Sequence, residues 1–336
     1  MDLIYMNPNM EDVGVLLDYE LDLAYGADEN SFECKIQAQN HCCGEGYFLY
    51  IDGTEYGGII DRIQVDTSKN EVTYSGRTWQ GILGSKVVYP FKGNELAPNN
   101  ITLSGPADRY LVISGDANWC ILTILLKANL AKMFNITGDD AGVNISAYQF
   151  HRYTDAYSGL CKMLKSAGLK LKTTFEGGVV VLSAVPLYDY SQDEEFDSDS
   201  VEFRLQKNYK TVNHLVCLGS GELENRTVVH LYADAEGNIS QTQTFTGLDE
   251  YEAVFDYPSA ESTEELIKSG TEELKALWSQ NELSISFDPE ADLYDVGDIV
   301  GAYDNITKIA VSAEIVKKIV TIRHGQTNIS YEVGEK

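Results

Sequence analysis

Short stretches in which apolar and polar residues alternate, separated by Gly, Asp and Asn, fill the first hundred residues. The alternation runs over residues 32–38 and again over residues 59–65, a period of two that predicts strands with one buried face. Asp52-Gly53 lies between such runs and is a hairpin signal. Within residues 75–83 the period lengthens, which predicts a short helix after the strands.

A similar pattern of short strands and glycine-rich turns returns at the C-terminal end of the chain. Residues 293–334 consist of β-branched runs separated by Gly and Asp-Asn punctuation, which predicts compact antiparallel strands. No nucleophile, metal-ligand set or phosphate loop lies on them, so this end of the chain favours a structural surface. The likeness of the two ends indicates two related β-barrels.

Three helices are expected between these ends. One covers residues 116–130, with Asp116 as its N-cap, and another opens at Thr154-Asp155. A third starts near Ser262, where Ser262-x-x-Glu265 is a capping box. Gly270 is expected to weaken the middle of this third helix.

The chain length limits the number of domains, and the net charge excludes some classes of binding partner. A chain of 336 residues is too long for one ordinary core, so two to four domains are expected. Its formal net charge of −27 repels nucleic-acid phosphates and anionic lipid. Residues 1–12 lack a basic n-region, and the longest apolar stretch, residues 121–126, is far too short for a bilayer. We therefore expect folding in a reducing cytosol, no membrane insertion and no sequence-specific nucleic-acid binding.

The cysteines and histidines show no metal-binding spacing. The six cysteines are expected to be free thiols, because Cys42-Cys43 is an adjacent pair and no second pair follows at zinc spacing. The histidines are scattered along the sequence, at His41, His151, His214, His230 and His324. The sequence therefore predicts no metal site and no cofactor.

Two local motifs carry weak chemical signals. Arg323-His324-Gly325 is similar to the Arg-His-Gly loop of histidine phosphatases, but only a few residues follow it, and the alternative is a Gly turn between two strands. Alternating acids in residues 193–199 resemble a calcium loop without its Gly and its final Glu. A solvated acidic linker is the alternative there.

The 21 tyrosines suit either a protein interface or the packing of β-sheets, and both interpretations stay open.

Four sequence blocks carry a resemblance to a known family. They are VTYSGRTWQGILGSKVVYP at 72–90, NHLVCLGSGELENRTVVHLY at 213–232, TGLDEYEAVFDY at 246–257 and DVGDIV at 295–300. In this order and spacing the chain resembles the tail-tip or baseplate hub proteins of tailed phages and prophages, the siphovirus tail-associated family.

The resemblance implies a β-rich α+β fold with baseplate-hub-like architecture. Two barrel-like antiparallel β domains would occupy residues 1–100 and residues 196–235 with 285–336. Two smaller α+β domains would be residues 101–195 and an inserted small α/β domain at residues 236–284. Three chains would form a homotrimeric ring between a distal tail protein or tail tube and a spike or fibre, at the tip of a virion tail made in the bacterial host cytoplasm.

The expected function is therefore structural, with no catalytic residue. Structural roles are expected for the following residues: Gly76, Arg77, Pro90, Gly297 and Asp298. Arg77 is expected to satisfy a carboxylate or carbonyls, and Gly76 to adopt a conformation that a β-carbon would disfavour. The alternatives are a Tyr-rich module that binds a receptor or cell-wall polysaccharide, and an enzyme acting through His324 or an acid pair.

Overall fold

The computed structural model divides the chain into two compact units, each described by itself below. It describes residues 1–93, 97–105, 109–192, 195–197, 203–206, 211–260, 262–278, 282–287 and 294–334. Unit 1 comprises Met1–Glu194, Ile285–Val300 and Glu314–Glu332, and unit 2 comprises Glu195–Ser284, Gly301–Ala313 and Val333–Lys336.

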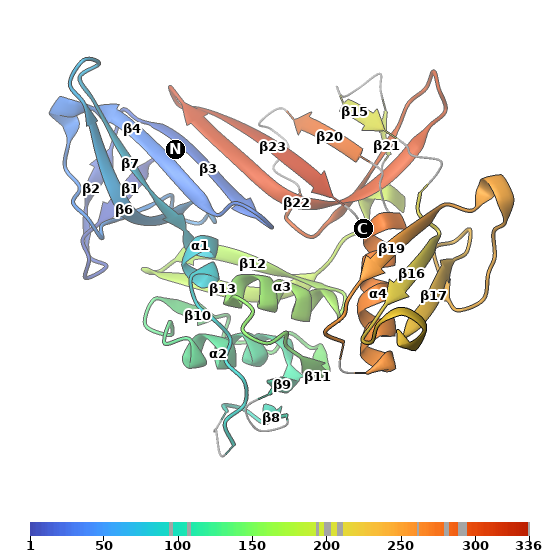
Figure 1. Ribbon diagram of the computed structural model, residues 1–336. Helices are drawn as coiled ribbons and strands as arrows, with labels where there is room; N and C mark the ends of the chain where they lie inside the picture. Colours follow the sequence, from blue (N-terminus) through green and yellow to red (C-terminus); the bar gives the residue numbers. More distant parts are fainter. Residues whose placement is uncertain are drawn as a thin grey trace. The chain divides into compact units, whose positions relative to one another are not determined.

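Most of the large sheet in unit 1 comes from the first eighty residues (Figure 1). Its strands follow the order β23-β22-β3-β4-β7-β6-β5-β1-β2. Their bounds are β1 (Leu3–Met6), β2 (Asp12–Leu16), β3 (Glu20–Gly26), β4 (Ser31–Gln37), β5 (Phe48–Tyr50), β6 (Gly57–Asp66), β7 (Glu71–Thr78), β22 (Ala310–Arg323) and β23 (Gln326–Gly334). The first residues of β22 and the last of β23 belong to unit 2.

The alternation read from the sequence is present in these strands. Along β4 the side chains of Phe32, Cys34 and Ile36 are buried, while the residues between them are at least partly exposed. The antiparallel pairing of β3 with β22 places Leu21 opposite Ile322. A strand from the start of the chain therefore pairs with one from its end.

This pairing bears on the predicted barrels. Among the described strands of unit 1 the order has β2 at one end, and no closed barrel is detected. The prediction of a β-rich α+β fold is confirmed. Period-two alternation fixes which face of a strand is buried but leaves its partner open, so it could not reveal that both ends of the chain share one sheet.

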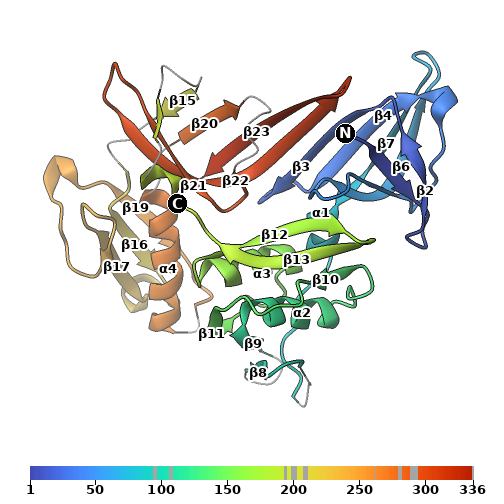
Figure 2. The same ribbon diagram turned by 180° about the vertical axis from the view of Figure 1, so that it is seen from behind.

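Beside the large sheet, the described residues of unit 1 form three α-helices and two small sheets (Figure 2). The helices are α1 (Trp79–Gly84), α2 (Ala117–Lys127) and α3 (Ala156–Lys165). One small sheet has the order β10-β13-β12 and the other β11-β9-β8. The bounds are β8 (Thr102–Ser104), β9 (Val112–Asp116), β10 (Phe134–Ile136), β11 (Asn144–Gln149), β12 (Leu169–Glu176) and β13 (Val179–Pro186).

The predicted helix starts of unit 1 are confirmed. The Asp116 carboxylate accepts hydrogen bonds from the backbone N–H groups of Asn118 and Trp119, and Asp155 accepts one from Ser158. The helices then pack onto the main core, in which the Trp79 ring stacks against Phe175 at 5.5 Å between centroids.

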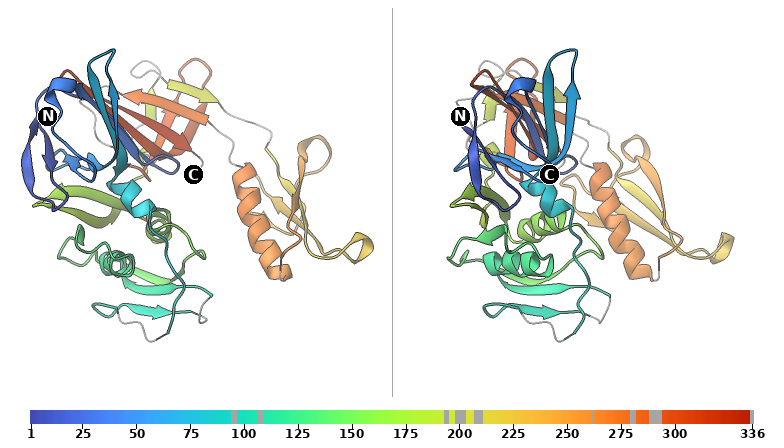
Figure 3. Two further views of the ribbon diagram at one scale, coloured as in Figure 1. Left: turned by 60° about the vertical axis from the view of Figure 1, so that its left-hand side comes forward. Right: turned by 90° about the vertical axis from the view of Figure 1, so that its left-hand side faces the viewer.

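Unit 2 contains a four-stranded sheet with the order β18-β17-β16-β19. Helix α4 (Thr263–Trp278) lies along one face of it (Figure 3). The strands are β16 (His214–Leu218), β17 (Val228–Ala233), β18 (Ile239–Ser240) and β19 (Glu252–Asp256). The predicted domain boundary at residue 235 falls inside this sheet, between β17 and β18, and the four-domain division stays a prediction.

Further short strands also belong to unit 2 in whole or in part. β14 (Glu195–Asp197) pairs in parallel with β21 (Ile299–Tyr303), through Glu195 opposite Gly301. β15 (Phe203–Gln206) pairs with β20 (Glu282–Phe287).

The Ser262 half of the predicted capping box is present at helix α4, whereas the glycine of this helix has another role. The Ser262 hydroxyl accepts a hydrogen bond from the Glu265 N–H. A β-carbon on Gly270 would lie 2.4 Å from the Cys217 Sγ and 2.9 Å from a Leu231 methyl group. Gly270 thus permits the close approach of α4 to the sheet, which its low helix propensity alone did not indicate.

Candidate functional site

The predicted residues on β7 hold strand pairs together. A β-carbon on Gly76 would meet the Ile59 carbonyl oxygen at 1.9 Å, so close contact with β6 requires the glycine. Arg77 donates two hydrogen bonds of 2.7 Å to the Asp61 carboxylate and one of 3.1 Å to the Ser85 hydroxyl. These bonds lower the pKa of the Asp61 carboxyl. Pro90 is buried after α1.

Asp298 is the centre of a buried ion pair in unit 1. Its side chain is 0% exposed, and its Oδ2 accepts a hydrogen bond of 2.6 Å from the Lys170 Nζ. The backbone N–H groups of Tyr188 and Asp295 donate to the same carboxylate, at 3.1 and 3.0 Å. The Asp295 carboxylate accepts a further bond of 2.8 Å from Lys170.

All the charged atoms of this pair therefore have partners. Burial acts to lower the pKa of Lys170, but the hydrogen bonds and charges of Asp295 and Asp298 outweigh it and raise the pKa. Gly297, which has a φ of +103°, makes the turn that brings Asp298 to Lys170. The ion pair joins β12 to the segment before β21.

A cavity of about 370 Å³ borders this ion pair in unit 1. Lys170, Gly297, Cys161 and Lys165 contribute to its lining. Lys165 pairs with Glu314 there, and burial raises the pKa of the Cys161 thiol to about 12. The charged partners are engaged with one another and the thiol stays protonated, so the cavity offers no activated nucleophile from these groups.

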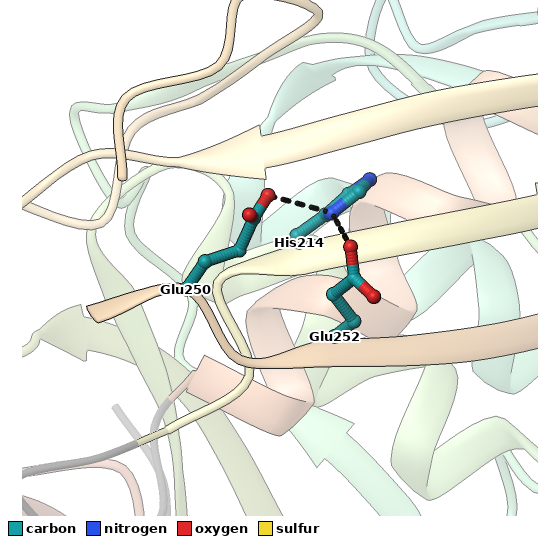
Figure 4. A group of neighbouring side chains, drawn as sticks. All are labelled: His214, Glu250 and Glu252. Carbon is teal, nitrogen blue, oxygen red and sulfur yellow. Dashed lines mark ion pairs between the residues drawn. The ribbon is translucent and has the colours of Figure 1, made fainter. Parts of the chain in front are cut away.

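A second polar cluster lies on the sheet of unit 2 (Figure 4). Its members are His214 at the start of β16, Glu252 at the start of β19, and Glu250 just before β19. The parallel register of the two strands places His214 opposite Glu252. The core side chains of β16, such as Leu215 and Cys217, belong to the cluster of buried residues that includes α4, so His214 lies on the other face.

Asn213 fixes the loop that carries Glu250. Its side-chain amide donates to the Asp249 carbonyl at 2.7 Å and accepts from the Tyr251 N–H at 2.9 Å. The backbone N–H of His214 also donates to the Tyr251 carbonyl, at 3.2 Å. These bonds fix the backbone on both sides of Glu250. Its carboxylate is thereby held beside the imidazole of His214, together with that of Glu252.

The imidazole of His214 is held between charged and aromatic neighbours. Its Nδ1 lies 3.0 Å from a carboxylate oxygen of Glu250 and 3.0 Å from one of Glu252. Its Nε2 lies 2.8 Å from the Nδ1 of His230. The Tyr232 ring stacks on it at 4.3 Å between centroids.

Sequence reasoning missed this cluster. It treated His214 and His230 as scattered, and they are sixteen residues apart in the chain but adjacent on β16 and β17. The pattern Glu250-Tyr-Glu252 places two acids on one side of an extended segment. That signal becomes informative only once the parallel pairing of β16 with β19 is known.

The weaker motifs have plain structural settings. His324 and Gly325, with φ values of 52° and 77°, form the two-residue turn between β22 and β23. Asp193, Ser198 and Asp199 of the acidic run lie outside the described residues.

All six cysteines are free thiols, and burial raises the pKa values of Cys34 and Cys120 to about 12. In the described parts of the chain, every helix is too short or too polar to span a bilayer.

The fold is shared with solved tail proteins. The 43 kDa tail protein of prophage MuSo2 from Shewanella oneidensis aligns with a TM-score of 0.60 at 10% identity, over 99% of this chain and 98% of that one. A tail protein from Neisseria meningitidis MC58 gives 0.53 at 13% identity, over 100% and 96%. Prophage tail protein gp18 from Listeria monocytogenes EGD-e gives 0.52 at 12% identity, over 100% and 95%.

No family model matches the chain, and no curated protein matches it either. The resemblance to phage and prophage tail proteins is confirmed at the level of the fold, by the three solved structures that align with the whole chain.

Proposed function

We propose that this chain is a structural protein of a phage or prophage tail, and that it forms a hub at the tail tip. One observation carries the proposal: three solved tail proteins share its fold from end to end, over at least 95% of their own lengths. An alignment of this extent includes every module, so the likeness extends beyond one widespread domain.

In this proposal three chains form a ring that joins the tail tube or a distal tail protein to a spike or fibre. The barrel-like β modules would alternate around the ring. Strand β2 supports such contacts, because it ends the sheet order of unit 1 and exposes Val13 and Val15, and Leu17 just after it is exposed as well. With −27 charges on each chain, apolar and backbone contacts of this kind are needed to offset the repulsion between copies.

The proposal assigns the chain to the virion tail after synthesis in the host cytoplasm, and it includes no catalytic step. The network around Asp298 and the Arg77–Asp61 pair would keep the modules rigid under load. Both networks use protein partners and leave no reactive group to position.

Light scattering of the purified chain, followed by electron microscopy of tailed particles that carry a labelled copy, tests the proposal. We expect a mass three times the 37.3 kDa of one chain, or assembly into that trimer once the neighbouring tail proteins are added. The label should lie at the tail tip. A label along the tube or on the head would refute the hub, and a stable dimer would refute the threefold ring.

A receptor- or polysaccharide-binding role is the second candidate, and one aromatic surface favours it. Tyr89 and Tyr153 are 55% and 52% exposed, and their rings meet edge to face at 6.1 Å. The Arg152 guanidinium lies over the Tyr153 ring at 5.0 Å. Exposed tyrosines of this kind suit sugar rings.

Replacement of both tyrosines by alanine separates the two candidates. Loss of binding to host cell walls with normal tail assembly would favour the binding module. Loss of assembly with unchanged wall binding would favour a subunit contact at this surface.

A further inference from the structure

One atom of the cluster on unit 2 is left without a hydrogen bond. The side chain of His214 is 6% exposed, and its Nδ1 is buried with no hydrogen-bond partner. Two carboxylate oxygens lie 3.0 Å from this nitrogen, but neither satisfies the angle of a hydrogen bond. A buried nitrogen that lies beside two anionic oxygens without a hydrogen bond to either is costly unless a cation lies among them.

The other side of the ring matches this interpretation. Nε2 of His214 is 2.8 Å from Nδ1 of His230, so it can donate its proton to that nitrogen. In the tautomer that carries the proton on Nε2, the Nδ1 lone pair is available to an ion. Histidines that bind metals usually donate their second ring N–H to a fixed acceptor in this way.

The acids are supported as well. The Oε1 of Glu250 accepts a hydrogen bond of 2.7 Å from the Gln243 side chain, and the loop is held by Asn213. Glu252 is 62% exposed, so an ion can enter from solvent. The three ligand atoms lie within 4.8 Å of one another, close enough for one ion to bind them all.

We propose that His214, Glu250 and Glu252 bind a divalent transition-metal ion of the Zn²⁺ class. An imidazole with two carboxylates suits Zn²⁺ and its neighbours, whereas Ca²⁺ and Mg²⁺ favour sites made of oxygen alone. Three protein ligands leave a fourth position for water or for a group from another protein. The ion ties the start of β16 to the loop before β19 and so stabilises the small sheet.

A protonated His214 is the rival explanation. An imidazolium between the two carboxylates would balance charge without a metal. It would donate Nδ1–H to one of the acids, which is the bond that the geometry lacks. The rival predicts no specific affinity for any divalent ion, so metal binding distinguishes the two.

Isothermal titration of the full-length chain with ZnCl₂ at pH 7.5 tests the proposal. The tag is removed, and every protein carries Cys42→Ser, because Cys42 is an exposed thiol that would bind zinc by itself. We expect one ion per chain, with Ca²⁺ and Mg²⁺ binding at least about 100-fold more weakly. X-ray absorption of the zinc complex should show one imidazole among oxygen ligands.

Glu252→Gln and Glu250→Gln are the informative variants, because each keeps the size of the side chain. Each should weaken zinc binding by about 10-fold or more. Glu272→Gln, which removes an exposed acid of α4 in the same unit, is the matched control and should bind like the parent. His214→Asn tests the central ligand, with circular dichroism to verify its fold.

The proposal is overturned by an absence of one-to-one zinc binding, or by binding that both glutamate variants leave unchanged. Equal affinity for Ca²⁺ would overturn the assigned metal class. If His214→Asn fails to fold, the glutamate variants still decide the outcome.

Discussion

Two polar clusters, one in each compact unit, have a buried side chain at their centre and differ in whether the polar atoms of that side chain are satisfied by the protein. In unit 1 the Asp298 carboxylate is completely buried and receives hydrogen bonds from Lys170 and from two backbone N–H groups. In unit 2 the buried Nδ1 of His214 faces two carboxylates and forms no hydrogen bond.

The difference distinguishes a cluster that stabilises the fold by itself from a cluster that can bind an ion. A buried ion pair whose hydrogen bonds all come from the protein needs no added ion. Removing one partner leaves the other charge buried and unpaired, which costs a large free energy. An unsatisfied atom among supported acids has a free energy that an added cation can lower. The first cluster should therefore respond to mutation and the second to metal.

The largest expected effect is that of Asp298→Ala. The change leaves Lys170 buried without its main partner, so the free energy of unfolding should fall by about 3–5 kcal/mol. Urea unfolding followed by fluorescence measures it. Asp295→Asn is the control, because that side chain is 42% exposed and should cost less than about 1 kcal/mol.

A double variant sharpens the test. Lys170→Met with Asp298→Leu removes both charges and should recover most of the lost stability. If Asp298→Ala unfolds at the same urea concentration as the parent chain, the ion pair contributes nothing to stability. The contrast drawn between the two clusters would then be wrong for unit 1.

Zinc should stabilise only the unit that contains the cluster. At a free zinc concentration one hundred times the dissociation constant, the gain is about 2.7 kcal/mol. Hydrogen exchange should slow in peptides from residues 211–260 and stay unchanged in peptides from residues 1–93. Slowing throughout the chain, or none at all, would contradict a local metal site.

These two clusters also mark the limit of what the sequence could predict. Helix starts were readable because a cap such as Asp116 or Asp155 acts on backbone groups two or three residues away. Asp298 was singled out through the resemblance of its block to a family, but its partner Lys170 lies 128 residues earlier in the chain. Local patterns carry no signal for such a contact.

The metal cluster was missed for the same reason. His214 and Glu252 become neighbours through parallel strand pairing, and alternation does not specify which strands pair. The large sheet illustrates the point again, because β3 pairs with β22 from the other end of the chain. Strand existence was predictable, whereas strand partners and the groups they bring together were not.

Gly270→Ala tests whether packing in unit 2 is independent of its polar cluster. The added methyl group would lie within 3 Å of Cys217 and Leu231, so overpacking should cost about 1–3 kcal/mol. The higher helix propensity of Ala offsets about 1 kcal/mol of this. Thermal unfolding should show a net loss, with the affinity for zinc unchanged, and a gain in stability would mean that α4 can shift away from the sheet.

The smallest expected effect concerns the exposed Arg77–Asp61 pair, whose side chains are 42% and 37% exposed. Arg77→Ala should cost less than about 1 kcal/mol at pH 7, because water screens the pair. The sign of the pH dependence follows from the lowered pKa of Asp61. A lowered folded-state pKa contributes stability above the unfolded value of about 3.9, and this contribution is lost as the pH falls through the folded-state value. Urea midpoints from pH 7 to pH 2.5 should therefore converge for the parent and Arg77→Ala as the pH falls below the unfolded value of about 3.9, whereas a constant difference would show that Arg77 acts through its bond to Ser85.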